Sequence, residues 1–86
     1  MQVLKVASRS NPNSVAGALA GVLEKDKIAE LHAIGAGAVN QTVKAIAISR
    51  RLLGQEDLRS LRVIPGFMEL TIGGEARTGI RFIVEM

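Results

Sequence analysis

Apolar and polar positions along the chain alternate between strand-like and helix-like spacing. Short apolar runs at residues 3–7 and 28–34 are typical of strands, and each is followed by a stretch with helical spacing of apolar residues. The last third of the chain has the pattern of two consecutive strands, separated by Gly73-Gly74 as a hairpin turn. The predicted element order is therefore β-α-β-α-β-β, and residues 1–86 are expected to form a single domain.

The first helix is predicted from Pro12 to about Lys25. Asn11 is a favourable N-cap, and Pro12 suits the first helical position because its missing N–H has no partner there. Asn13 is an alternative cap. In either case, the helix starts immediately after a loop of small polar residues.

The second helix is predicted over residues 39–53, with Gly54 as its C-cap. Its apolar residues fall on two sides when they are placed about 100° apart. The side expected to face the sheet contains Val39, Val43, Ile46 and Leu53. A second apolar strip contains Ala45, Ile48 and Leu52. A helix that is apolar on two sides needs a second packing partner.

After this helix, a long strand is predicted from Leu58 to Ile72, with a bulge or bend at Pro65-Gly66. The final strand alternates cleanly, with its apolar residues on one face. Right-handed crossovers place both helices on one face of a four-stranded mixed sheet. The predicted fold is an α/β two-layer sandwich. Its opposite face is expected to carry Lys5, His32, Arg62, Arg77 and Arg81.

Composition narrows the possible functions. Apolar residues make up 48% of the chain, too many for a disordered protein. There is no Cys, no signal peptide, and no apolar run near the roughly 18 residues of a membrane span, so a cytoplasmic protein without a membrane partner is expected. The net charge of +3 fits a nucleic-acid-binding protein, although no basic cluster is longer than Arg50-Arg51.

Two strand-to-helix loops carry the candidate chemistry. Each combines small residues with the start of a helix, where free backbone N–H groups and the helix dipole favour an anion. The alternatives are a plain tight turn and an ordinary polar helix face. If phosphates bind, the predicted contact residues are Ser8, Arg9, Ser10, Asn11, Asn13, Gly35, Gly37, Asn40, Gln41 and Lys44.

Other chemistries find little support in the sequence. His32 has no Cys or second His with which to bind a metal, and no nucleophile is paired with a base, so no enzyme activity, metal or cofactor is expected. Gly35 and Gly37 match only part of a dinucleotide fingerprint, because Asn40 replaces its third glycine. Without Tyr or Trp, base stacking of the kind used by RNA-recognition domains is not available.

Two long segments, residues 10–20 and 33–41, together with Lys44-Ala45, resemble the stage V sporulation protein S family, and the similarity extends over essentially the whole chain. That family is bacterial, is tied to sporulation and cell-division control, and resembles the archaeal chromatin protein Alba. The resemblance implies the Alba fold, a dimer, and binding to DNA or RNA with little sequence preference.

The comparison with Alba also implies a difference in charge. Alba has a lysine pair in its first strand-to-helix loop, where this chain has Ser8 and Arg9. Alba's second loop is rich in arginine, whereas the matching loop here is Gly35 to Gly37. The resemblance therefore implies weak phosphate binding or a changed ligand. We interpret the chain as a nucleic-acid-binding regulator; the alternative is a protein-interaction module of sporulation or division control without direct nucleic-acid binding.

The second apolar strip on the second helix predicts self-association. A homodimer would bury the strip together with apolar residues of the C-terminal hairpin. The expected interface residues are Ile48, Leu52, Phe67 and Leu70. The alternative is that the hairpin folds back over the strip within one chain.

Overall fold

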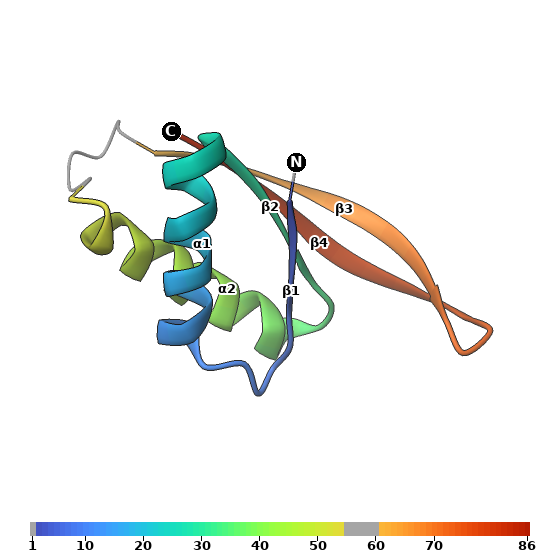
Figure 1. Ribbon diagram of the computed structural model, residues 1–86. Coiled ribbons are helices and arrows are strands. Elements are labelled where there is room, and N and C mark those ends of the chain that lie inside the picture. The colour runs from blue at the N-terminus through green and yellow to red at the C-terminus, as the bar shows by residue number, and fades with distance from the viewer. Residues whose placement is uncertain (1, 55–60) are drawn as a thin grey trace.

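The sheet contains four strands in the order β1-β2-β4-β3, in a computed structural model that describes residues 2–54 and 61–86 (Figure 1). The strands are β1 (Val3–Val6), β2 (Ile28–Ala33), β3 (Arg62–Ile72) and β4 (Glu75–Glu85). β1 and β2 are parallel, and β4 is antiparallel to both of its neighbours, β2 and β3. The predicted β-α-β-α-β-β order and mixed sheet are confirmed.

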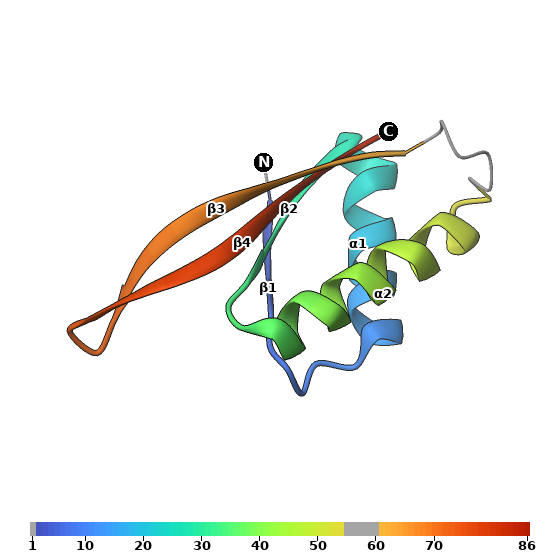
Figure 2. The same ribbon diagram turned by 180° about the vertical axis from the view of Figure 1, so that it is seen from behind.

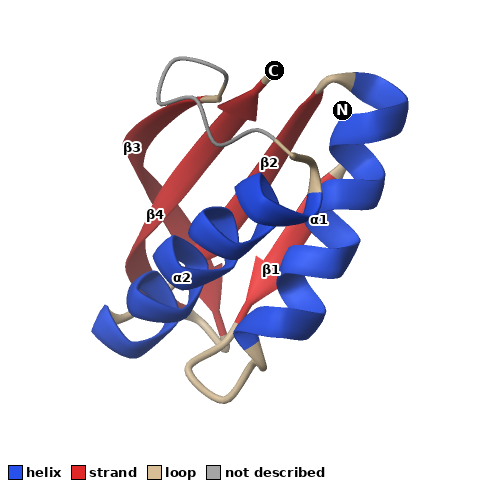
Figure 3. Ribbon diagram, turned by 90° about the vertical axis from the view of Figure 1, so that its left-hand side faces the viewer, coloured by secondary structure: helices blue, strands red, loops and turns tan. Residues whose placement is uncertain are grey.

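Both helices lie on the same face of this sheet, as Figure 3 shows. They are α1 (Pro12–Asp26), which follows its N-cap Asn11, and α2 (Ala36–Leu52). The C-cap of α2 is Leu53, one residue before the predicted Gly54. Gly54 follows this cap with a φ of 67°, the left-handed conformation that glycine favours after a helix C-terminus. No helix in the described part of the chain is long and apolar enough to cross a membrane.

The buried face of α2 differs from the predicted one. Val43 was expected to face the sheet but is 52% exposed, whereas Ala45, assigned to the outer strip, is fully buried. The face that packs inward also contains Thr42 and Ser49, whose hydroxyls donate to carbonyl oxygens one turn earlier in the same helix. These small side chains let α2 approach α1 and the sheet closely, and this packing outweighs the pattern of larger apolar residues.

The course of β3 also differs from the prediction. No bulge occurs at Pro65-Gly66, because both residues pair in unbroken register with Phe82 and Arg81 of β4. β3 is an edge strand, where a proline that cannot donate to the ladder is tolerated. The predicted start of this strand at Leu58 lies outside the described residues, and the described strand begins at Arg62.

The β3–β4 hairpin extends beyond the rest of the sheet, as Figures 1 and 2 show. Pairing between β2 and β4 ends at Ala33 and Ile80, but β3 and β4 remain paired as far as Ile72 and Glu75. The predicted Gly73-Gly74 turn is confirmed, since both glycines have the positive φ of a type I′ turn. We call the part of the hairpin beyond Ile80 the arm, residues 68–79. It projects past the carboxyl ends of β1 and β2.

The base of the arm depends on a glycine at position 79. A Cβ atom at this position would lie 2.9 Å from the carbonyl oxygen of Ala33 and 3.0 Å from Cγ1 of Ile34. Cβ atoms are essentially never found this close to a backbone oxygen, and the oxygen belongs to the central strand β2. Gly79 is therefore needed for β2 and β4 to meet at the root of the arm.

Replacing Gly79 with Ala should lower the free energy of unfolding by about 1–3 kcal/mol, because the added methyl group overpacks the junction with β2. Gly66→Ala is the matched control: it also lies in the hairpin, and a Cβ there meets nothing within 4 Å. The control should be neutral or slightly stabilising. Thermal unfolding of both variants measures the difference, and a Gly79→Ala protein that melts at or above the wild-type temperature would refute the packing argument.

Candidate functional site

The two strand-to-helix loops meet at one edge of the molecule, at the bottom of Figures 1 and 3. They follow adjacent parallel strands, so their positions at the same edge follow from the topology. Their contact is close, because a Cβ atom added to Gly37 would lie 2.9 Å from Cβ of Ser8. In addition, the Gln41 side chain donates from Nε2 to the carbonyl oxygen of Ser10 over 2.9 Å. The first loop is therefore attached to the start of α2.

The first loop is also held by bonds within itself. Ser10 Oγ accepts from the backbone N–H of Ala7 at 2.9 Å, and the Ser10 N–H donates to the Ala7 carbonyl at 3.0 Å. Asn11 Oδ1 accepts from the N–H groups of Asn13 and Ser14 at 2.8 and 3.3 Å. The polar atoms of Ser10 and Asn11 thus support the loop, and they are less available to a ligand than the sequence suggested.

The two helix N-termini differ in their capacity to bind an anion. At α1, the side chain of Asn11 already occupies two of the free N–H groups. At α2, the N-cap is Gly35, with a φ of 91° and no side-chain cap. Ala36 and Gly37, the first two residues of α2, are exposed. Their N–H groups and the positive end of the helix dipole form the more open of the two predicted anion sites.

α2 begins earlier than predicted, at Ala36 instead of Val39. Asn40 and Gln41, expected in its first turn, therefore lie further along the helix. Gln41 bonds to the first loop, whereas Asn40 remains exposed on the outer face of α2. Lys44 is exposed one turn after Asn40, on the same face.

The exposed polar groups define what this edge can bind. The set that we call the loop edge consists of Ser8, Arg9, Asn13, Gly35, Gly37, Asn40 and Lys44, all of which are exposed. Its two cations are Arg9 and Lys44, and the set contains no acidic residue. Cationic side chains, amides and backbone N–H groups can together bind an oxyanion such as a phosphate. Among the described residues, no cluster of His, Asp and Glu could hold a metal ion.

Sequence reasoning did not include the arm in this site. The arm projects at the same end of the sheet as the loop edge, and it carries Arg77 exposed on the face opposite the helices. The feature of the sequence that could have predicted the arm is strand length, because each strand of the hairpin has 11 residues and β2 has 6. A hairpin much longer than its neighbouring strand must extend past it.

The four predicted interface residues do not share one face. Phe67 is 80% exposed on the helix side of β3, while Leu70, three positions further along the strand, lies on the opposite side. Ile48 lies two turns after Gln41 on the same side of α2, the side turned toward the first loop. Leu52, 57% exposed, lies one turn further on. Val43, 52% exposed, lies roughly 200° around α2 from Gln41, on the side away from the first loop.

Comparisons with known proteins identify both a family and a fold. Residues 2–86 match the family described as stage V sporulation protein S (SpoVS). Among solved structures, Alba from Thermoplasma volcanium is similar with a TM-score of 0.66 and 10% sequence identity, over 98% of this chain and 99% of that chain. The structural match at this low identity establishes the Alba-like fold, and the family match is consistent with the resemblance seen in the sequence.

The contact between the two loops can be tested with a double-mutant cycle. Gly37→Ala places a methyl group against Ser8, and Ser8→Gly removes the atom that it would meet. We expect the two changes to be non-additive by about 1 kcal/mol in the free energy of unfolding, with Ser8→Gly rescuing Gly37→Ala.

Gly17→Ala, in α1, provides the control because a Cβ there meets nothing within 4 Å. It should combine additively with Ser8→Gly. Full additivity of the Gly37 and Ser8 changes, measured by denaturant unfolding, would show that the loops do not touch as described.

Proposed function

The chain belongs to the stage V sporulation protein S family, and we propose that it acts there as a nucleic-acid-binding regulatory protein whose loop edge contacts the phosphate backbone. It is a sporulation-related protein with an Alba-like fold. A cytoplasmic location, where DNA and RNA are found, is part of the same proposal. The proposal requires no catalytic step, metal or cofactor.

The observation that carries the proposal is the convergence of the two loops. The contact of Ser8 with Gly37 brings Arg9 to the same edge as the uncapped N-terminus of α2. A phosphate there would receive backbone N–H donors from α2 and charge from Arg9 and Lys44. Phosphate contacts of this kind position a nucleic acid without reading its sequence, so we propose binding with weak sequence preference.

The arm supports an extended contact. It projects at the end of the molecule where the loop edge lies, and it carries one exposed cation, Arg77, together with two exposed acids, Glu69 and Glu75. The long dimension of the protein, 42 Å compared with 22 and 20 Å, gives a surface that could follow several phosphates of a duplex. The arm would therefore add length to the contact and no net positive charge.

A second candidate function is a protein-interaction module of sporulation or division control. The observation that favours it is Phe67, a large apolar side chain that is 80% exposed on the helix side of β3. A partner protein bound there would need no contact with the loop edge. Salt separates the two functions, because phosphate binding weakens steeply as salt rises and an apolar interface does not.

The double variant Arg9→Glu/Lys44→Glu should weaken binding to duplex DNA or RNA and lower the slope of log K against log salt by about two, the loss of two phosphate contacts. Fluorescence anisotropy at several salt concentrations measures both quantities. Both residues are exposed, so the fold should be unaffected.

The matched control is Lys25→Glu/Lys27→Glu, which changes the net charge equally but lies at the opposite end of α1 (Figure 1). It should change affinity only through the overall charge and should leave the salt slope nearly unchanged. If the loop-edge variant binds as the wild type does, or if both variants lose the same slope, the proposed interface is incorrect.

We also propose that the protein is a homodimer whose interface is centred on Phe67. This residue is the cross-strand neighbour of Ile80, which packs against the core on the helix side of the sheet. An exposed aromatic ring there, with Val43 exposed on α2, is a surface that a second copy could bury about a two-fold axis. Leu52 lies on the other side of α2, and Leu70 faces the opposite side of the sheet, so neither belongs to the proposed interface.

Phe67→Asp should raise the dimer dissociation constant more than tenfold, because a carboxylate would be buried where an aromatic ring was. Ile64→Asp is the control: it is 52% exposed on the same strand, but on the opposite face. Light scattering at micromolar concentration should give a dimer for the wild type and the control and a monomer for Phe67→Asp. A wild-type monomer, or a dimer that tolerates Phe67→Asp, would contradict this interface.

A further inference from the structure

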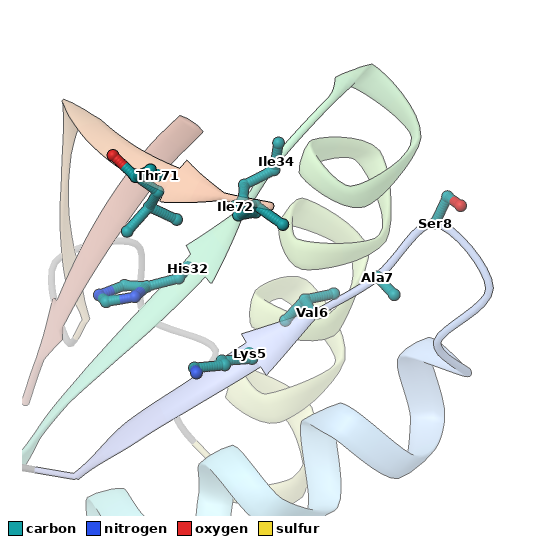
Figure 4. Close-up of a pocket in the computed structure, with 9 residues that line it drawn as sticks. Lys5, Val6, Ala7, Ser8, His32, Ile34, Thr71 and Ile72 are labelled. Atoms are coloured by element: carbon teal, nitrogen blue, oxygen red, sulfur yellow. The ribbon is translucent and has the colours of Figure 1, made fainter. Parts of the chain in front are cut away.

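A pocket of about 520 Å³ opens on the sheet face that the helices leave uncovered. It lies where the end of β1, the end of β2 and the arm come together (Figure 4). This volume is in the range of small-molecule sites, about 300–1,000 Å³. Apart from Ser8, the residues that line it are separate from the loop edge, so nucleic-acid binding does not account for it.

The wall of the pocket is aliphatic. Leu70 and Ile72 come from the arm, and Ile34 comes from the end of β2. Ile34 can lie over β4 because Gly79 has no side chain there, and its Cγ1 is 3.0 Å from where a Cβ would be. Ile72 remains 49% exposed although it belongs to this wall. Covering such a surface with an apolar chain lowers the free energy, because it removes apolar area from water.

One end of the pocket is basic. Lys5 and His32 are cross-strand neighbours, and Figure 4 shows both side chains at the same end of the pocket, away from Ser8. Arg81 pairs with His32 on the next strand, so these three basic residues form a row on this face. The nearby acid, Glu30, is hydrogen-bonded to His32 Nε2. In the described part of the chain, Lys5 has no ion-pair partner.

We propose that this pocket binds an aliphatic chain that ends in an anionic head group, a carboxylate or a phosphate. The chain would lie along Ile34, Leu70 and Ile72, and the head group would be bound by Lys5. A neutral aliphatic molecule would leave this cation without a partner, and a short anion without a chain would leave the wall exposed. The two halves of the pocket therefore select a ligand that is apolar at one end and negatively charged at the other.

The aliphatic half is tested by titrating the 86-residue chain with hexanoate, octanoate and decanoate and recording amide chemical shifts in NMR spectra. Saturable shifts should appear at His32, Ile34 and Ile72, and affinity should rise about fourfold for each added methylene until the pocket is full. Octyl phosphate in place of octanoate distinguishes the two head groups, and tighter binding of either one is consistent with the site. Shifts absent from these residues for both ligands would overturn the proposal.

The charged half is tested by Lys5→Met, which keeps the length of the side chain and removes its charge. The affinity for octanoate should fall about three- to tenfold, and the affinity for octanol should not change. Lys25→Met, far from the pocket on α1, should change neither affinity. Ile72→Asp places a carboxylate in the wall and should abolish binding of both ligands. The proposal fails if the wild type binds octanol as tightly as octanoate, or if Lys5→Met binds octanoate as the wild type does.

Discussion

The close approach of Ser8 to the backbone at Gly37 is the contact on which the candidate site depends. A side chain at position 37 would meet Cβ of Ser8 at 2.9 Å and would push the first loop away from α2. The bond from Gln41 to the Ser10 carbonyl then keeps this loop at its position. As a result, Arg9 belongs to the same edge as the N-terminus of α2, and the two predicted anion sites form one surface.

The capping of the two helices determines which backbone N–H groups of the loop edge are free to bind a ligand. Because the Asn11 side chain caps the N-terminus of α1 and no side chain caps that of α2, the free N–H groups of the edge belong mainly to α2. Their contribution is a fixed partial positive charge that does not depend on flexible side chains. Under the proposed function, such a site would position a phosphate but add little counterion release. Each copy of the protein would then need either a long contact or a partner copy to bind a nucleic acid tightly.

The elements of the fold could be predicted from the sequence because each has a local cause. Asn11-Pro12 starts a helix, Gly54 ends one, and Gly73-Gly74 permits a tight hairpin turn. The meeting of the two loops also follows from the sequence, since adjacent parallel strands bring their carboxyl ends together. These signals involve residues close in sequence or a general rule of topology, and neither depends on the details of packing.

The remaining features depend on contacts between distant segments. Ala45 is buried instead of Val43 because α2 approaches its neighbours closely. The spacing of apolar residues in the sequence does not predict this distance. Pro65 keeps its register because β3 is at the edge of the sheet, a position set by strand order. Two further features likewise join residues far apart in the chain. One is the hydrogen bond from Gln41 to the Ser10 carbonyl, and the other is the pocket between Lys5 and the arm.

The most direct test of the central claim is the salt dependence of nucleic-acid binding by the wild-type protein. Fluorescent duplex DNA, single-stranded DNA and RNA would each be titrated at two or more salt concentrations. The account predicts that the association constant falls as a power of the salt concentration, with similar affinity for unrelated sequences. No binding at low salt, or binding that does not change with salt, would contradict the assignment of the loop edge as a phosphate-binding surface.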